Sequence, residues 1–312
     1  MFEIERYSPE KKEEWNAFVE TSKNGTFLFN RNYMDYHSDR FADWSLMVYN
    51  GGRLYGLLPA NHKEGVWYSH QGLTYGGLIT NEHATAADTV ELFATLNTYL
   101  RANGFKGVVY KAVPWIYHVL PAEEDLYAIY RECNARLAAR DIASSIVMNH
   151  RPKWFRSRKY GINRSRNNGV TVEQSEDFAA FWQILDDNLM NKYHVRPVHT
   201  LEEMLLLKSR FPNNIKLYLA RKEGRAIGGT VLYLTTQVAH AQYISANPEG
   251  KHWGAIDAIY DRILNHDCTG YKYFDFGKST EDRGQVLNAS LIFQKEGFGG
   301  RGVCYDWYEW QL

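Results

Sequence analysis

Apolar and polar positions follow each other along the first half of the chain with the periods of strands and amphipathic helices. Residues 2–7 alternate with a period of two, and residues 10–22 then place Trp15, Phe18 and Val19 at helical spacing. The rest of this half predicts a second helical segment, a glycine-linked pair of strands, an extended run, a long helix and a last strand. We expect these elements at residues 29–36, 44–60, 66–79, 85–103 and 107–113.

The second half of the chain presents a similar order of elements. It predicts a short strand, two helices, a hairpin, another strand, a helix and a final strand. These elements are expected at residues 170–174, 177–190, 201–211, 215–235, 238–246, 255–265 and 271–277. Because the two orders agree, we infer an internal duplication with a period of about 160 residues. The sequence therefore predicts two domains, residues 1–150 and 151–312.

Composition narrows the classes of protein to consider. The chain has 36 Lys and Arg against 36 Asp and Glu, and this zero net charge disfavours binding to nucleic acid or anionic membrane through the overall field. The 9 Trp, 22 Tyr and 15 Phe supply packed cores and ring-lined clefts, which excludes a disordered chain. The sequence shows neither a long apolar run nor a leader-like start, so we expect a cytoplasmic protein without stable membrane insertion.

The sequence does not favour metal or thiol chemistry. Cys133, Cys268 and Cys304 have no paired spacing, and the 11 histidines are scattered without an HExxH pattern. We therefore expect neither a disulfide framework nor a metal site.

A basic segment separates the two halves. Residues 151–166 contain Lys and Arg at seven positions and no acidic residue, interleaved with Trp154, Phe155 and Tyr160. Such a segment can bind phosphates by charge and stack bases or sugars on its rings. The alternative is a solvated segment between two domains.

The segment Tyr243–Ile256 has the most informative pattern. It places a glycine-containing turn between a strand and the first turn of a helix, where backbone N–H groups and the helix dipole favour a pyrophosphate. The spacing Lys251-x-x-Gly254-Ala255 resembles the Arg/Gln-x-x-Gly-x-Gly/Ala signature of the GNAT acyltransferases, whose loop holds the pyrophosphate of acyl-coenzyme A. The resemblance implies that donor binding involves Ala246, Asn247, Gly250, Lys251, His252, Trp253, Gly254 and Ala255.

Further motifs resemble the FemABX-like branch of the GNAT superfamily. Asp275-Phe276-Gly277 at a strand end, and Lys295 followed by Phe298-Gly299, are similar to its C-terminal motifs, although Gln294 stands where the branch has Phe. Earlier segments that resemble the branch, in the same order, lie at residues 69–79, 156–172 and 196–212. The resemblance implies an α/β (α+β) fold of two tandem GNAT-like domains, each a mixed, mostly antiparallel sheet flanked by helices.

The resemblance also implies direct attack of an amine on the acyl donor, without a covalent enzyme intermediate. Such transfer needs a base for the ammonium proton and a donor for the developing oxyanion. Asp275, His240, Tyr243 and His199 are candidate bases, and Tyr243 is also a candidate proton donor to the leaving thiolate. Lys295 is expected in a loop-like, glycine-rich tail, where its charge would neutralise a donor phosphate or the oxyanion.

The corresponding loop of the first half differs. Residues 81–88, NEHATAAD, contain no glycine. We therefore predict that the first domain has lost its donor site and serves as scaffold and acceptor wall, while the second domain binds the donor.

Three functions remain open. The first is an N-acyltransferase that moves an acyl group, expected to be acetyl, from acyl-CoA to a primary amine of an amino-sugar or peptide-like acceptor. The second, which the basic segment favours, is a Fem-type enzyme of cell-envelope peptide synthesis that uses aminoacyl-tRNA. The third is a non-catalytic module that binds a glycan or a peptide. The neutral net charge favours the first over the second.

Overall fold

Two units make up the chain in the computed structural model, which describes residues 2–312 except the side chain of Tyr193. Unit 1 comprises Met1–Asp141, Glu281–Val286 and Cys304–Leu312, and unit 2 comprises Ile142–Thr280 and Leu287–Val303. These limits differ from the expected domains 1–150 and 151–312. The C-terminal strand pairs with a strand of the first unit, and local periodicity cannot reveal such a long-range pairing.

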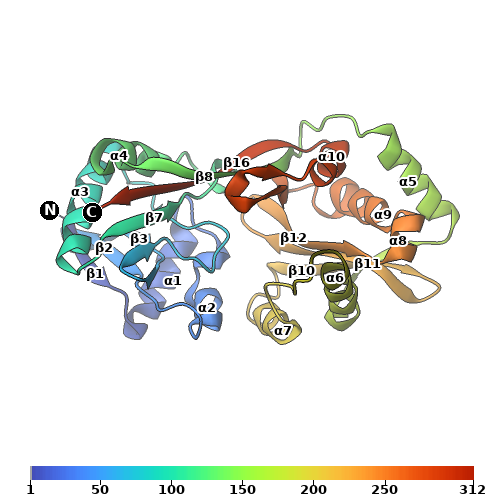
Figure 1. Ribbon diagram of the computed structural model, residues 1–312, viewed down its shortest axis with the longest axis horizontal. Coiled ribbons are helices and arrows are strands. Elements are labelled where there is room, and N and C mark those ends of the chain that lie inside the picture. The colour runs from blue at the N-terminus through green and yellow to red at the C-terminus, as the bar shows by residue number, and fades with distance from the viewer. Residues whose placement is uncertain (1) are drawn as a thin grey trace. The chain divides into compact units, whose positions relative to one another are not determined.

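Unit 1 contains two groups of strands and the helices beside them (Figure 1). One sheet has the order β1-β2-β3-β6 with antiparallel neighbours, and β4, β5, β7 and β16 follow one another in a second. Strand β5 runs parallel to β7, and β16 runs antiparallel to it with Trp307 opposite Lys111. The strands are β1 Phe2–Arg6, β2 Leu46–Asn50, β3 Arg53–Leu58, β4 Asn61–Lys63, β5 Val66–Tyr68, β6 Ile79–Thr80, β7 Gly107–Lys111 and β16 Arg301–Gln311.

The helices of unit 1 cover an aromatic core. Helix α3 begins after Thr85, whose hydroxyl accepts a hydrogen bond from the Asp88 amide, and its apolar face packs on Trp67, Tyr110 and Trp310. The predicted extended run 66–79 is a strand only at its two ends. The helices are α1 Lys12–Thr21, α2 Arg31–Met34, α3 Ala86–Ala102 and α4 Glu124–Cys133.

Unit 2 contains one sheet with helices on both faces (Figure 1). Its strands follow the order β9-β10-β11-β12-β13-β8, and all neighbours are antiparallel except β12 and β13. The strands are β8 Arg136–Val147, β9 Thr171–Ser175, β10 Ile215–Lys222, β11 Arg225–Leu234, β12 Val238–Ala246 and β13 Tyr273–Lys278, and β14 Thr280–Glu281 pairs with β15 Val286–Leu287.

Capping residues set several helix starts in unit 2. Thr200 and Glu203 form a reciprocal capping box at the start of α7, and Asp177 and Asn288 cap α6 and α10. Helix α9 packs on β10, β11 and β12 from one face, while α6 and α7 cover the other (Figure 1). The helices are α5 Arg156–Asn167, α6 Phe178–Tyr193, α7 Leu201–Arg210, α8 Pro248–Trp253, α9 Ala255–Arg262 and α10 Ala289–Gly297.

Candidate functional site

A gap between two parallel strands opens a cavity in unit 2. The pairing of β12 with β13 runs from Val238 to His240 on one strand and from Tyr273 to Asp275 on the other, and it ends there. Strand β12 also carries a bulge at Gln242, and a bulge bends its strand. A cavity of about 380 Å³ lies beside the parts of the two strands that follow these pairs.

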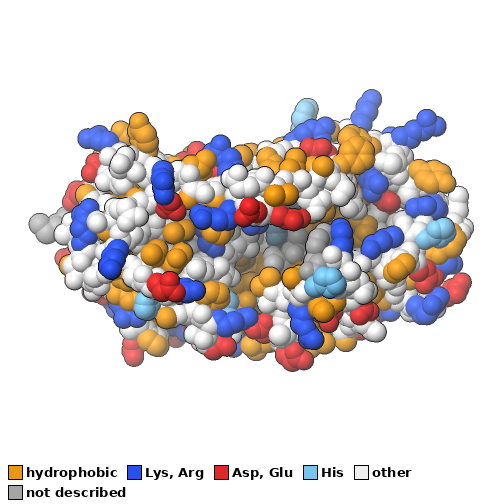
Figure 2. Space-filling model, in the orientation of Figure 1, with side chains coloured by type: hydrophobic (Ala, Val, Ile, Leu, Met, Phe, Trp, Pro, Cys, Tyr) orange, Lys and Arg blue, Asp and Glu red, His pale blue; other side chains and the backbone are white. Residues whose placement is uncertain are grey.

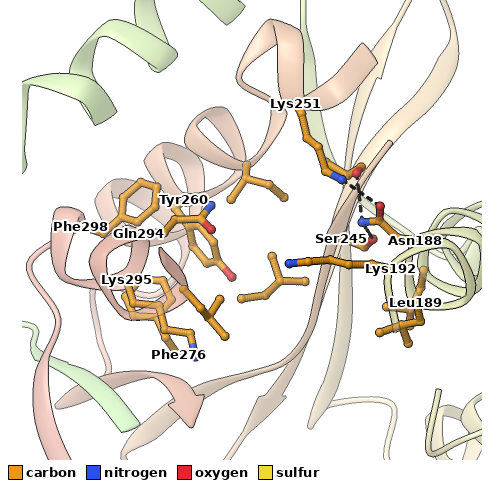
Figure 3. A pocket seen from close by; sticks show the side chains of 15 residues that line it. Asn188, Leu189, Lys192, Ser245, Lys251, Tyr260, Phe276, Gln294, Lys295 and Phe298 are labelled. Carbon is orange, nitrogen blue, oxygen red and sulfur yellow. Dashed lines mark hydrogen bonds between the residues drawn. The ribbon is translucent and has the colours of Figure 1, made fainter. Parts of the chain in front are cut away.

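The cavity has polar groups at opposite sides of an apolar interior. Figure 3 shows Asn188, Lys192, Ser245 and Lys251 on one side and Lys295 on the other, with Lys192 pointing inward. The apolar and aromatic lining residues are Leu185, Leu189, Ile244, Ala246, Ile256, Tyr260, Phe276, Leu291 and Phe298. The lining residues that the structure describes include three lysines and no carboxylate, so the cavity favours an anionic ligand with a long apolar part.

A hydrogen-bond network joins α6 to the end of β12. The Asn188 side-chain amide donates to Ser245 Oγ at 2.9 Å and to the carbonyl of Ala246 at 3.2 Å. Its oxygen accepts a bond from Lys251 Nζ at 2.8 Å (Figure 3). An ammonium group has three protons, so Lys251 keeps donor capacity for an anion while Asn188 holds its position.

Lys295 lies in helix α10 rather than in the loop-like tail expected from the sequence. The side chain is buried, with 4% of its surface exposed. Its Nζ donates to the carbonyl of Gly277 at 2.9 Å and to that of Lys278 at 2.6 Å. Burial lowers the pKa of Lys295 to about 8, although the nearby Asp275 carboxylate opposes this shift. Near neutral pH the group is therefore a largely charged cation at the cavity wall.

The expected donor loop folds as a short helix, α8, of six residues. Asn247 caps it: its side chain accepts the Gly250 amide at 2.7 Å, and its carbonyl accepts the Lys251 amide at 2.9 Å. These two amides are therefore already bonded within the loop. The sequence predicted free amides here because glycine and the turn position do not reveal such a cap.

Only part of the loop reaches the cavity. Ala246 and Lys251 line it, together with Ile256 at the start of α9. Gly250 is buried and lies close against β11. A Cβ added to it would lie only 2.0 Å from the carbonyl oxygen of Ile227. The remaining expected donor residues are outside the lining; they are Asn247, His252, Trp253, Gly254 and Ala255.

Tyr243 and His199 form a second cluster, with Trp182. The Tyr243 hydroxyl lies 2.6 Å from His199 Nδ1, and the Trp182 indole donates to the His199 carbonyl at 3.2 Å. Burial raises the pKa of Tyr243 to about 12. Neither of these candidate catalytic residues belongs to the cavity lining.

Asp275 is fully buried at the point where β12 and β13 part. Its Oδ1 accepts a bond from Ser145 Oγ at 2.7 Å and from the Gly277 amide at 3.2 Å. Its Oδ2 lies 2.8 Å from His240 Nδ1. The structure thus brings two candidate bases, Asp275 and His240, into contact. Gly277 links them to Lys295, because the Gly277 carbonyl accepts a hydrogen bond from the Lys295 ammonium.

Several cations of the basic segment are bonded inside unit 2. Arg151 donates to the carbonyl of Leu264 at 2.7 Å, and Arg158 pairs with Asp257 at 2.8 Å. Burial raises the pKa of Asp257 to about 6, against the effect of Arg158. Lys153, Arg156 and Lys159 are exposed, and on the face shown in Figure 2 positive and negative side chains are interspersed.

Residues 2–312 include no helix that is both long and apolar enough to cross a bilayer. Within the same residues, His, Cys, Asp and Glu side chains do not gather in threes in a way that could hold a metal ion.

Sequence reasoning missed the α6 side of the cavity. Asn188 and Lys192 lie near the end of a helix whose apolar periodicity marks only its packing face, so no local motif distinguishes them. The gap between β12 and β13 depends on strand pairing, which sequence periodicity does not give. The sequence did contain one signal for this side of the cavity. Asn188 and Lys192 are four residues apart near the end of an apolar helix, and this spacing places them on the same face.

Comparison with protein families finds one match. Residues 149–282 match the family model for the acetyltransferase (GNAT) domain. This range includes helix α5 and strands β9 to β13. A search of curated proteins finds no match to the sequence.

Solved structures resemble the whole chain. FemX superposes with a TM-score of 0.69 at 10% identity and covers 99% of this chain and 97% of its own. A tandem GNAT protein from the clavulanic acid biosynthesis pathway gives 0.52 at 13% identity, with 100% and 98% covered. The C-terminal domain of a protein described as a lysylphosphatidylglycerol synthetase, from Agrobacterium fabrum, gives 0.56 at 12% identity, with 82% and 81% covered.

Proposed function

The chain has the tandem-GNAT acyltransferase fold that its sequence predicted, with a GNAT domain at residues 149–282, and on this premise we propose that it is an acyl-CoA-dependent N-acyltransferase. The donor is an acyl-CoA, with acetyl-CoA as the first candidate. The acceptor is a primary amine of an amino sugar or a peptide-like molecule. The reaction forms an amide and releases coenzyme A.

The cavity between β12 and β13 is the observation that carries the proposal. Coenzyme A combines phosphates with a narrow, mostly apolar arm that contains two amide groups. Lys192 and Lys251 supply cations for the phosphates at one side, and the start of α9 next to Ile256 adds the positive end of a helix. The apolar lining and the edge of β12 beyond its pairing with β13 suit the arm.

Lys295 suits the reacting end of the donor. When the amine nitrogen attacks the thioester carbonyl, the carbonyl oxygen becomes an oxyanion, the nitrogen loses a proton and the thiolate leaves. A buried ammonium stabilises a developing negative charge more strongly than an exposed one, because water screens it less. The carbonyls of Gly277 and Lys278 hold this ammonium in place before the substrate arrives.

A Fem-type transfer from aminoacyl-tRNA is the second candidate. The exposed cations Lys153, Arg156 and Lys159 favour it, because tRNA binding rests on phosphate contacts. The internal bonds of Arg151 and Arg158 reduce the charge that the segment offers to a nucleic acid. The acceptor role and lost donor site of the first half stay predictions from the sequence under either candidate.

Donor use can be measured directly. The full chain is incubated with radiolabelled acetyl-CoA or with labelled aminoacyl-tRNA, each with a panel of amino sugars and short peptides. We expect label transfer from acetyl-CoA and little dependence on salt. Transfer only from aminoacyl-tRNA, reduced by salt and by Arg156→Ala with Lys159→Ala, would replace the proposal by the second candidate. Binding of an acceptor without transfer from either donor would favour a non-catalytic module.

A further inference from the structure

Four side chains form a row across the sheet of unit 2. Tyr233 on β11 is the register partner of His240 on β12, His240 is the partner of Asp275 on β13, and Asp275 is the partner of Ser145 on β8. Direct partners in a sheet point to the same face. Ala239 and Ala241, which flank His240, pack in the core under α9, so the row lies on the opposite face.

Hydrogen bonds connect three members of this row, and both bonds meet at the Asp275 carboxylate. Ser145 Oγ donates to Asp275 Oδ1 at 2.7 Å, and His240 Nδ1 lies 2.8 Å from Asp275 Oδ2. The Gly277 amide adds a donor to Oδ1 at 3.2 Å. Because a carboxylate only accepts hydrogen bonds, Asp275 fixes the neutral imidazole as the Nδ1–H tautomer, and the proton-accepting lone pair is then on Nε2.

The row lies next to the cavity, although its four residues are not among those that line it. His240 and Asp275 are the last paired residues of β12 and β13, and Phe276, the next residue on β13, lines the cavity. A Cβ placed on Gly277 would lie 3.1 Å from His240 Cε1, so the imidazole packs against this glycine. The carbonyl of the same glycine accepts the ammonium of Lys295.

We propose that His240 is the general base of the acyl transfer, and that Asp275 and Ser145 are positioning residues that fix its tautomer and orientation. This inference rests on the proposed function. Aminolysis of a thioester needs a base for the attacking nitrogen and a positive group for the oxyanion. His240 supplies the base and Lys295 the positive group, and Asp275 and Gly277 connect the two through hydrogen bonds.

The step balances without any further reactant. The acceptor nitrogen forms a bond to the thioester carbon, and its extra proton moves to Nε2 of His240. The carbon–sulfur bond then breaks, and the electron pair leaves with sulfur. The imidazolium, stabilised by the Asp275 carboxylate, returns the proton to the thiolate or to water. The products are the amide and coenzyme A, and His240 is again neutral.

The test measures acetyl transfer by the full chain against pH for the wild type and for His240→Asn, Asp275→Asn and Ser145→Ala. In His240→Asn we expect kcat to fall by about 10²–10⁴-fold, the range that general bases contribute, while acetyl-CoA still binds. In Asp275→Asn we expect kcat to fall while KM for acetyl-CoA changes little, because the imidazole loses the carboxylate that orients it.

A matched control is His266→Asn, which removes an exposed histidine of unit 2 outside the site and should leave the rate unchanged. Ser145→Ala should lower kcat less than Asp275→Asn does, with KM unaltered. A His240→Asn variant with wild-type kcat would overturn the inference and leave the proposed function intact. A wild type that transfers from no acyl-CoA would instead overturn the proposed function and the role of His240 with it.

A second measurement does not depend on the variants folding. Nitrogen-15 NMR of the wild-type imidazoles identifies which ring nitrogen of each carries the proton. We expect the neutral imidazole of His240 to be the Nδ1–H tautomer. Finding the Nε2–H tautomer would overturn the inference even if the enzyme transfers acyl groups from coenzyme A.

Discussion

The buried ammonium of Lys295 makes the stability of unit 2 depend on pH in a direction that can be worked out. Lys295 has a pKa of about 8 in the folded chain, against an ordinary value of 10.5. Between these two values the unfolded chain binds more protons than the folded chain, so the free energy of unfolding rises with pH. The cost of burying the charge is fully present below about pH 8.

The magnitude follows from the two pKa values. The penalty is about 3 kcal/mol at pH 7 and about 1 kcal/mol at pH 9.5, so the wild type gains about 2 kcal/mol between them from this group. Lys295→Met carries no such proton. Urea unfolding at pH 7 and pH 9.5 should therefore show a rise in the free energy of unfolding that is about 2 kcal/mol larger for the wild type than for Lys295→Met.

The matched control is Lys153→Met, which removes an exposed lysine of unit 2. Its difference between the two pH values should equal that of the wild type. Equal pH dependence in the wild type and in Lys295→Met would refute the reasoning, because it would mean that Lys295 has an ordinary pKa and is not desolvated.

Two further predictions concern packing outside the cavity. Gly250→Ala should lower the free energy of unfolding by about 1–3 kcal/mol, because the new methyl overlaps the Ile227 carbonyl, whereas Gly270→Ala has open space and should have little effect; urea melts compare the two, and equal stability would contradict the packing. Tyr243→Phe should cost about 1 kcal/mol through the lost bond to His199, and an unchanged urea midpoint would contradict that bond.

The sequence predicted the local elements of unit 2 well because their periodicity and caps are local properties. Helices α6 and α7 and strands β10 to β12 lie where the apolar pattern and the hairpin expected at residues 215–235 place them. The tandem-GNAT fold was predicted from several motifs in the expected order, and the solved structures that resemble the chain confirm it.

Elements that depend on distant partners escaped the sequence. Strands β8 and β16 were not predicted, because each is defined by pairing with strands far away in the chain. Lys295 was predicted in a loop-like tail because Gly297, Gly299 and Gly300 follow it closely. In the structure, Asn288 caps a helix in which Lys295 is buried.

The candidate site was predicted in pieces. Lys251 and Lys295 were expected from motifs, and both line the cavity. The Asn247 cap, which occupies two amides of the loop, was missed because a side-chain cap depends on backbone geometry rather than on residue type alone. The hydrogen bond between Asp275 and His240 was also missed, because it forms only when β12 and β13 lie side by side.

Calorimetric titration of acetyl-CoA tests the central claim most directly. The wild type is compared with Leu189→Trp, which places an indole in the cavity, and with Leu206→Trp, which makes the same change at an exposed position of α7. The cavity account predicts binding to the wild type and to Leu206→Trp, with at least a tenfold loss of affinity, about 1.4 kcal/mol, in Leu189→Trp. Equal affinity in all three proteins, or no binding to the wild type, would contradict it.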